Sequence, residues 1–138
     1  GAGEYRGGSG AVRVYRSMNE NQTFTASFGR NKWPVWGAAG GKDGSVNYFQ
    51  FIDADGTVSE PMGIAARRVM NTNDVVRMVT ATGGGYGNPF KRPAEKVAMD
   101  VKNEYITVEQ AKADYGVLVD PETFKVLGLT EERQKAEK

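Results

Sequence analysis

Glycine is concentrated in three short segments, and these segments constrain the fold more than any other feature of the chain. They are "GAGEYRGGSG" at the start, "WGAAGGKDG" from residue 36 and "GGGYG" from residue 83. Glycine lacks a Cβ, so it adopts positive φ and lets two backbones approach closely. The intervening stretches carry aromatic and β-branched residues suited to burial, which disordered linkers lack. We therefore expect a folded chain that reverses direction repeatedly, with disorder as the competing interpretation.

Composition excludes several classes of function. The 138 residues suffice for one domain with a core. A formal charge of +1 provides no strong field to attract nucleic acid or an anionic membrane. The chain contains neither cysteine nor histidine, which excludes disulfides, the usual zinc ligands, a cysteine nucleophile and an imidazole base. With no long apolar run and no secretory signal, we expect a cytoplasmic protein without nucleic-acid or membrane partners.

The amino-terminal part predicts antiparallel strands. "AVRVYRSM" alternates Val12 and Val14 with Arg13, which is typical of a half-buried strand. "QTFTASF" repeats this period, and the polar "MNEN" between the two runs favours a turn. We therefore expect these two strands to pair as a hairpin.

Later turn signals extend this β pattern. "NYFQFID" is followed by Asp55-Gly56, a strong hairpin signal, and "NTND" separates the apolar runs "IAARRVM" and "VVRMVTA". The interpretation is a mainly β, α+β fold: an antiparallel β meander followed by two or three short helices. We expect a glycine-rich β domain over residues 1–90 and a carboxyl-terminal helical extension over 91–138, packed on the same unit.

The helices are predicted from periodicity and caps. Pro93 is placed to start a first helix, whose apolar residues Val97 and Val101 are four positions apart. A second helix has Thr107 as N-cap with Gln110 in a capping box, and it ends at Gly116. The remainder through "LTEERQKAEK" is expected to be a charged helical end that frays.

The glycine loops do not match known phosphate loops. "TGGGYGNP" lacks the Gly-Lys-Ser/Thr of a Walker loop, and Asn88 occupies the position where a dinucleotide fingerprint starting at Gly83 needs its third glycine. "DADG" has its glycine too early for a calcium loop, so the hairpin interpretation is preferred. The carboxylates Asp53, Asp55 and Glu60 could form an acid-base pair, although exposed turn acids are far commoner.

The stretch "RNKWPVWGAAGG" combines two tryptophans with proline, arginine and glycine. The preferred interpretation is a core-lining loop with Trp33 and Trp36 as packing anchors. The alternative is an aromatic wall that contacts a ligand or another subunit. The pair Arg67-Arg68 is expected to straddle a strand without forming a nucleic-acid patch.

Taken together, three stretches resemble the carboxyl-terminal part of the hydantoinase B/oxoprolinase family. They are "GAGEYRGGSGAVRVYR", "FGRNKWPVWGAAGGKDG" and "TATGGGYGNPFKRPAEKVAMDVKNEYITVEQAKADYGVLVD", and the resemblance extends to about Asp120. It implies ATP-dependent enzymes that open hydantoins or 5-oxoproline, or that carboxylate acetone or acetophenone. It further implies an actin-like hydantoinase A-type partner that uses ATP, and a divalent metal in the larger upstream region of the B-type part.

The resemblance also identifies candidate site residues for substrate or interface binding, while catalytic residues stay unknown. These candidates are Arg6, Arg30, Trp36, Gly83, Gly84, Gly85, Tyr86 and Gly87. Further motif positions without an assigned role are Gly7, Gly8, Pro34, Gly37, Gly40, Gly41 and Pro89. "TATGGG" departs from the family's more usual Thr-Pro-Gly-Gly-Gly-Gly, and Asn88 stands where aspartate is common. We expect "TGGGYG" to be a tight-packing turn near an active site or subunit interface, with Pro89 fixing its exit.

These expectations define three functional hypotheses. The first is a small subunit or carboxyl-terminal fragment of an ATP-dependent cyclic-amide hydrolase, inactive alone, whose ATP/Mg and metal ion are held by partner subunits. The second is a subunit of an acetone- or acetophenone-type carboxylase. The third is a non-catalytic scaffold in such a complex. In each case the expected partners are larger hydantoinase B-type and A-type subunits, and no cofactor or metal is expected on this chain.

Overall fold

The computed structural model describes residues 1–136, which form two compact units. One, here called the β unit, comprises Gly10–Val35 and Ser45–Thr82. The other, here called the helical unit, comprises Gly1–Ser9, Trp36–Gly44 and the chain from Gly83. The helical unit therefore includes two glycine-rich segments from before residue 83, in addition to the chain from Gly83. The two units are not two continuous stretches divided at residue 90.

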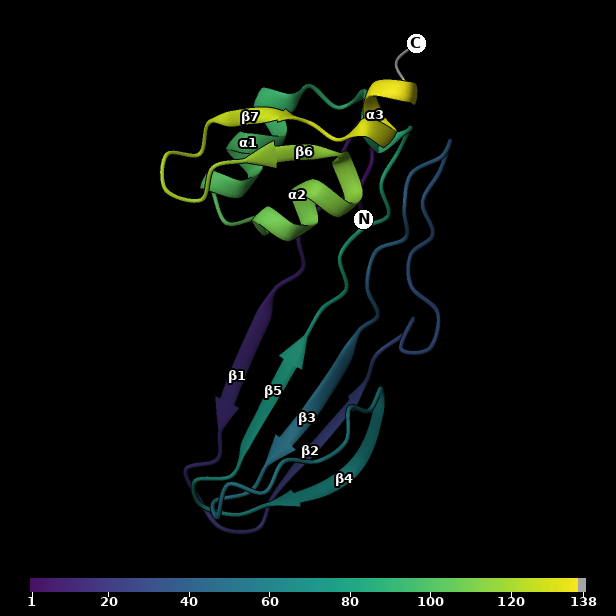
Figure 1. Ribbon diagram of the computed structural model, residues 1–138. Helices are drawn as coiled ribbons and strands as arrows, with labels where there is room; N and C mark the ends of the chain where they lie inside the picture. Colours follow the sequence, from purple (N-terminus) through teal and green to yellow (C-terminus); the bar gives the residue numbers. More distant parts are fainter. Residues whose placement is uncertain (137–138) are drawn as a thin grey trace. The chain divides into compact units, whose positions relative to one another are not determined.

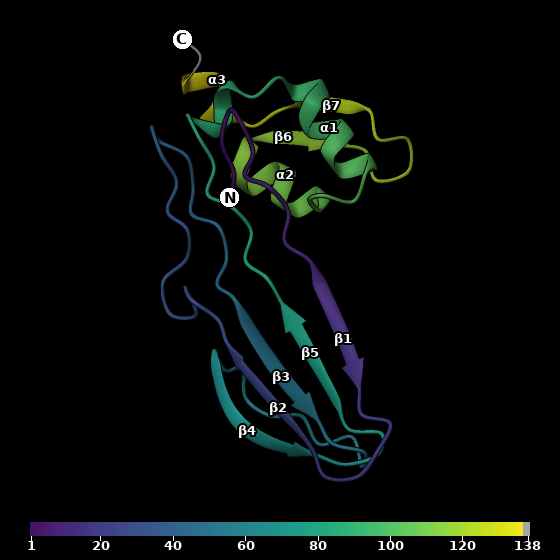
Figure 2. The same cartoon turned by 180° about the vertical axis from the view of Figure 1, so that it is seen from behind.

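Five strands make up the β unit (Figures 1 and 2). They are β1 (Val12–Arg16), β2 (Gln22–Ser27), β3 (Tyr48–Ile52), β4 (Ile64–Met70) and β5 (Val75–Val79). An antiparallel three-stranded sheet has the order β1-β5-β3, and β2 pairs with β4 in a separate antiparallel ribbon.

A phenylalanine cluster forms the core of the β unit. Phe49 and Phe51 on β3 are almost completely buried, together with Val76 and Met70. Phe24 on β2 meets both β3 rings edge-on, at centroid separations of 5.8 and 5.6 Å. Edge-to-face pairs of this kind contribute about 0.5–1.5 kcal/mol each beyond area burial. These rings hold the β2-β4 ribbon against the three-stranded sheet.

The predicted hairpin between the first two strands is wrong. β1 pairs with β5 and β2 pairs with β4, so neighbours in sequence do not follow the meander order. The turn signals locate chain reversals, but they do not decide which strands pair. β2 lies in its own ribbon with β4, and the partly buried Phe24 packs against the β3 rings. The broader class, mainly β with carboxyl-terminal helices, is confirmed.

The Asp55-Gly56 turn forms as expected. Gly56 has φ +90°, and the Asp53 N–H donates to the Thr57 carbonyl at 2.9 Å. After the turn, the chain returns along β3 through isolated bridges, of which Ile52 with Val58 is one. A residue with a Cβ would be strained at Gly56, which explains why the sequence has glycine there.

The described residues of the helical unit form three α-helices, a short 3-10 helix and a two-stranded sheet (Figure 1). Its elements are η1 (Pro89–Lys91), α1 (Ala94–Lys102), α2 (Val108–Tyr115), β6 (Val117–Val119), β7 (Val126–Leu129) and α3 (Glu131–Ala136). Val97 and Val101 on α1 are buried with Ala111 and Tyr115 on α2. The apolar spacing noted on α1 therefore identifies its core-facing side.

The caps of α2 match the sequence prediction. The Thr107 side chain accepts a hydrogen bond from the Gln110 N–H, and the Gln110 side chain accepts one from the Thr107 N–H. Gly116 ends the helix with φ +63° in the left-handed conformation. This reciprocal pair satisfies two backbone donors that a helix start otherwise leaves open.

Sequence reasoning missed the β6-β7 sheet, which lies where we expected only a helical end. Val117 and Val119 on β6 are buried against the helices. The last helix is also better anchored than predicted, because Arg133 is buried and donates to the Tyr115 carbonyl at 3.0 Å. Residues 137 and 138 of the predicted frayed end lie outside the described residues.

Candidate functional site

The three glycine-rich segments meet in the helical unit as a hydrogen-bonded arrangement that we call the glycine ladder. It is formed by residues 1–7, 37–42 and 83–87. The Tyr5 and Tyr86 backbones exchange hydrogen bonds of 3.0 and 2.9 Å, and the Ala38 N–H donates to the Gly85 carbonyl at 2.9 Å. The Lys42 backbone continues the ladder, accepting from the Gly85 N–H and donating to the Ala2 carbonyl. Each of the three segments is thus hydrogen-bonded to both of the others.

Glycine is required in this ladder mainly by close approach of backbones. A Cβ added at Gly85 would overlap the Ala2 carbonyl oxygen, and one at Gly84 would overlap the Trp36 carbonyl oxygen. Neither of these glycines has positive φ; within this loop only Gly87 does, at +75°. Of the two reasons considered for the glycine run, tight packing applies at Gly84 and Gly85, and positive φ applies at Gly87.

The ladder carries two tyrosines on its surface. Tyr5 and Tyr86 are 64% and 57% exposed, and their rings lie 6.2 Å apart at an interplanar angle of 54°. Cross-strand aromatic pairs contact each other in this way when their residues face each other in a ladder. The backbone pairing of Tyr5 with Tyr86 therefore presents an aromatic surface rather than a buried core.

The two tryptophans are also exposed, which corrects the expected packing role. Trp36 in the helical unit is 70% exposed, and Trp33 in the β unit is 79% exposed. Neither side chain is a core anchor within this chain. Large exposed aromatic side chains of this kind are typical of contact surfaces.

Arg6 lies beside the ladder and reaches a buried carboxylate. Its Nε is 3.4 Å from Asp100 Oδ2, and Arg92 Nη2 is 2.9 Å from the same oxygen. The Arg6 guanidinium also lies over the Tyr105 ring, 4.5 Å from its centroid. Asp100 is only 7% exposed, so the two arginines compensate a carboxylate that would be costly to bury alone.

This buried ion cluster ties the amino-terminal segment to the helices. Arg92 donates to the Glu4 carbonyl at 3.0 Å, and Arg133 donates to the Arg92 carbonyl at 2.9 Å. Sequence reasoning selected Arg6 but missed Arg92 and Asp100. One signal could have found Asp100: it occupies the apolar face of α1 next to Val101, where an unpaired charge would be unfavourable.

The candidate site residues divide between the two units. Arg6, Trp36 and the glycine run 83–87 belong to the helical unit, whereas Arg30 belongs to the β unit. Arg30 is exposed in a loop, has φ +54°, and its carbonyl accepts from the Asn47 N–H at 3.1 Å. Arg30 is therefore not part of the ladder.

Carboxylates of the β unit act as turn and surface groups. Hydrogen bonds from Thr57 lower the pKa of Asp55, which caps its own turn. Asp53 pairs with Arg68 at 3.2 Å on an exposed surface. Among residues 1–136, no group of three or more acidic, histidine or cysteine side chains is arranged to hold a metal ion.

The titration of one buried group is shifted in the helical unit. Burial raises the pKa of the Tyr115 hydroxyl above its ordinary value of 10.0. The charge of Asp100 raises this pKa further, whereas the charge of Arg92 lowers it. Tyr115 is 1% exposed and belongs to the helical core, so we assign it a packing role.

None of the helices in the described part of the chain is long and apolar enough to cross a membrane.

Comparison with known proteins gives matches over most of the chain. Residues 1–89 match the family described as Hydantoinase B/oxoprolinase. The B-type subunit of a "Putative D-/L-hydantoinase" from Pseudomonas sp. (strain NS671) is 32% identical over 119 residues, which are 85% of this chain and 20% of that protein. The beta subunit of caprolactamase from Pseudomonas jessenii is 30% identical, with 87% of this chain and 21% of that protein covered.

Solved structures show the same fold. An ATP-dependent caprolactamase from Pseudomonas jessenii superposes with a TM-score of 0.73 at 28% identity, over 98% of this chain and 23% of that chain. A nucleotide-free acetone carboxylase superposes with a TM-score of 0.76 at 20% identity, over 98% and 22%. This chain therefore spans about a fifth of the length of the curated relatives it matches. The match over residues 1–89 shows that the chain belongs to the hydantoinase B/oxoprolinase family.

Proposed function

We propose that this chain is a portion of a hydantoinase B-type subunit in an ATP-dependent cyclic-amide hydrolase, and that it is inactive alone. The observation that carries the proposal is the similarity, over most of this chain, to the B-type subunit of a hydantoinase and to the beta subunit of a caprolactamase. Hydantoins and caprolactam share a ring amide bond. A common ring-opening reaction is therefore the simplest interpretation of this pair of relatives.

A ketone carboxylase is the second candidate. Acetone carboxylase has the same fold, but at 20% identity this likeness concerns the fold alone. The caprolactamase structure is 28% identical over the same share of the chain. The higher identity favours ring opening over carboxylation.

Within such an enzyme the glycine ladder provides a rigid contact surface. Its backbone groups are largely paired with one another, while the Tyr5 and Tyr86 side chains remain exposed. Nucleotide would be bound elsewhere, since the glycine run 83–87 is not followed by the lysine and hydroxyl residue of a phosphate loop. We assign ATP/Mg to an actin-like hydantoinase A-type partner and the divalent metal to the remainder of the B-type part. The ladder glycines, Tyr86 and Trp36 are then contact residues, and Arg6 is a positioning residue.

Substrate-dependent ATP hydrolysis by the complete complex tests the proposal. Phosphate release is measured with hydantoin, 5-oxoproline or caprolactam, and separately with acetone or acetophenone plus bicarbonate. We expect phosphate release coupled to opening of a cyclic amide. Release with ketones alone would contradict the assignment and support the carboxylase.

A second arm separates a contributing part from a scaffold. Complexes that carry Gly85→Ala are compared with complexes that carry Gly8→Ala, because a Cβ at Gly8 meets no atom within 4 Å. We expect Gly85→Ala to reduce turnover in assembled complexes, and Gly8→Ala to leave it unchanged. Full turnover in assembled Gly85→Ala complexes would indicate a scaffold whose ladder does not reach the site.

A further inference from the structure

Strand β1 lies at the edge of its sheet with every side chain exposed. Among the described strands it pairs with β5 alone. Val12, Val14 and Tyr15 are 55%, 61% and 51% exposed, although this residue pattern predicted a half-buried strand. The expectation that Val12 and Val14 face the core is wrong for this chain. An apolar alternation that finds no core within the chain indicates a cover from outside it.

Apolar side chains occupy both faces of β1. Tyr15 lies opposite Val76, which is fully buried, and so belongs to the core-facing side of the sheet. Val12 and Val14 lie on the opposite side, because successive residues of a strand alternate. Edge strands are usually protected by charge, proline or a bulge, whereas strands apolar on both faces are typical of sheet interiors. β1 thus combines two exposed arginines, which suit an edge strand, with exposed apolar side chains on both of its faces.

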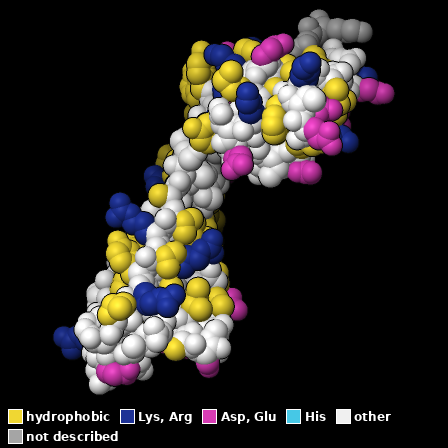
Figure 3. Space-filling model, turned by 90° about the vertical axis from the view of Figure 1, so that its left-hand side faces the viewer, with side chains coloured by type: hydrophobic (Ala, Val, Ile, Leu, Met, Phe, Trp, Pro, Cys, Tyr) yellow, Lys and Arg dark blue, Asp and Glu magenta, His cyan; other side chains and the backbone are white. Residues whose placement is uncertain are grey.

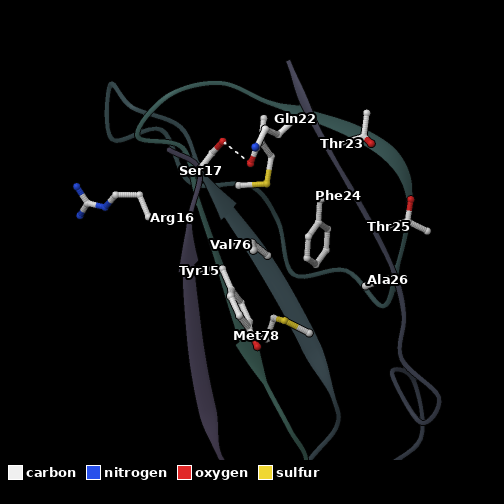
Figure 4. A pocket seen from close by; sticks show the side chains of 11 residues that line it. Tyr15, Arg16, Ser17, Gln22, Thr23, Phe24, Thr25, Ala26, Val76 and Met78 are labelled. Atoms are coloured by element: carbon white, nitrogen blue, oxygen red, sulfur yellow. Dashed lines mark hydrogen bonds between the residues drawn. The ribbon is translucent and has the colours of Figure 1, made fainter. Parts of the chain in front are cut away.

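A groove opens between β1 and β2 on the core-facing side (Figure 4). Its volume is about 440 Å³, and Tyr15, Phe24, Val76 and Met78 line it. Figure 4 shows these four side chains directed into the space between the two strands, whereas Arg16 points away from it. The groove is therefore an apolar trough beside the free edge of β1, within the β unit.

The hydrogen-bond pattern shows which backbone groups of β1 are available. The Ser17 N–H donates to the Asp74 carbonyl, and the Thr80 N–H donates to the Ala11 carbonyl. Opposed residues in antiparallel strands alternate between bonded and non-bonded pairs, so the odd residues from 11 to 17 face β5. The residues whose N–H and C=O groups point along the free edge are Val12, Val14 and Arg16.

We propose that an extended segment from the remainder of the hydantoinase B-type subunit pairs with the free edge of β1. Strand addition supplies main-chain hydrogen bonds, and alternate side chains of the added segment fall on opposite faces. One set of its side chains fills the groove against Tyr15 and Met78. The other set covers Val12 and Val14. A single added strand thus explains both the unfilled groove and the exposed valines.

The occupant is argued from length and charge. About four fifths of each curated relative has no counterpart in this chain, so a long partner segment of the same subunit exists in those proteins. On the face of the β unit drawn in Figure 3, hydrophobic and basic side chains intermingle and acidic ones are few. Arg13 and Arg16 on β1 are exposed. We therefore expect apolar residues at alternate positions of the added strand and a carboxylate within reach of one arginine.

Amide hydrogen exchange tests the pairing. The 138-residue chain alone is compared with the complete hydantoinase B-type subunit, at single-residue resolution along β1. We expect exchange at Val12, Val14 and Arg16 to slow by about tenfold or more in the complete subunit. Exchange at Arg13 and Tyr15, which already face β5, is the internal control and should change less. Equal exchange of the outward amides in both samples would overturn the proposal.

A photo-crosslinking amino acid at Val14 identifies the occupant. Mass spectrometry of the complete complex should find the crosslink on a B-type segment outside this chain. A crosslink to the A-type subunit, or to β1 of a second copy, would overturn the proposal.

A backbone variant tests the hydrogen bonds of the same edge. Val14→Pro removes one outward N–H, which an edge strand tolerates, whereas Val14→Thr retains it. We expect Val14→Pro, but not Val14→Thr, to restore fast exchange at the neighbouring outward amides. Unchanged protection in Val14→Pro would contradict strand addition.

The choice of the occupant rests on the proposed function, but the tests distinguish failure of the strand addition from failure of the proposed reaction. Protection of β1 in a complex that opens no cyclic amide would support the strand addition and reject the proposed reaction. An unprotected β1 edge in an active amide hydrolase would reject the strand addition alone.

Discussion

Gly85→Ala is the substitution that tests the glycine ladder most sharply. Gly85 lies between two segments, and an added Cβ would overlap the Ala2 carbonyl oxygen, with the Gly3 nitrogen 2.9 Å away. These neighbours are backbone atoms of the ladder, where the Ala2 carbonyl already accepts from the Lys42 N–H, so no flexible side chain can move aside. The ladder must separate locally to accept the methyl group.

The expected cost follows from this geometry. Inserting a methyl group into a well-packed site costs about 1–3 kcal/mol, and a site enclosed by backbone belongs at the upper end. A loss of about 3 kcal/mol lowers the melting temperature of a domain of this size by roughly 10 °C. Gly8→Ala is the matched control, since a Cβ there meets no atom within 4 Å and its expected effect is within about 0.5 kcal/mol.

Thermal melts followed by circular dichroism, together with urea unfolding, measure both variants. We expect a large destabilisation for Gly85→Ala and almost none for Gly8→Ala. Gly84→Ala should resemble Gly85→Ala, because its Cβ would overlap the Trp36 carbonyl oxygen. Equal melting temperatures for the Gly85 and Gly8 variants would refute the close-approach account of the ladder.

Three further outcomes follow from the helical unit. Asp100→Ala leaves two arginines uncompensated and should lower the free energy of unfolding in urea by about 3–5 kcal/mol. Asp53→Ala, which breaks the exposed pair with Arg68, should lower it by under about 1 kcal/mol. Equal losses would contradict the importance of burial. Thr107→Ala removes a capping-box hydroxyl and should cost about 1 kcal/mol, seen as a lower urea midpoint. The pKa of Tyr115 is higher in the folded chain than its value of about 10 in the unfolded chain. The protonated hydroxyl therefore contributes fully to folding stability below about pH 10, and this contribution is lost as pH rises further. Tyr115→Phe should therefore reduce the fall in urea midpoint between about pH 9 and 11, and an unchanged slope would contradict that assignment.

Local signals predicted the local structure of this chain well. The capping box at Thr107, the left-handed stop at Gly116 and the turn at Gly56 each depend on a few adjacent residues, and all three form as expected. Such features are encoded where they occur, because their hydrogen bonds and φ requirements lie within one turn. The sequence therefore predicted element types better than strand partners.

Long-range features were harder to predict for a physical reason. The period-two pattern of β1 identified a strand, but it could not reveal that Val12 and Val14 would find no cover within this chain. The ion cluster joins Arg6 to Asp100, which is distant in the sequence, and nothing local to Arg6 identifies its partner. Likewise, the three glycine segments suggested close approach, whereas their assembly into one ladder became evident only in the fold.

Affinity purification of the native assembly through a tag on this chain tests the central claim most directly. Mass spectrometry of the purified material should find the rest of a hydantoinase B-type subunit, either in the same polypeptide or as a stoichiometric partner. An actin-like hydantoinase A-type subunit should accompany it. Recovery of the chain as a free monomer under conditions that preserve native complexes, with neither polypeptide present, would contradict its assignment to a hydantoinase B-type assembly.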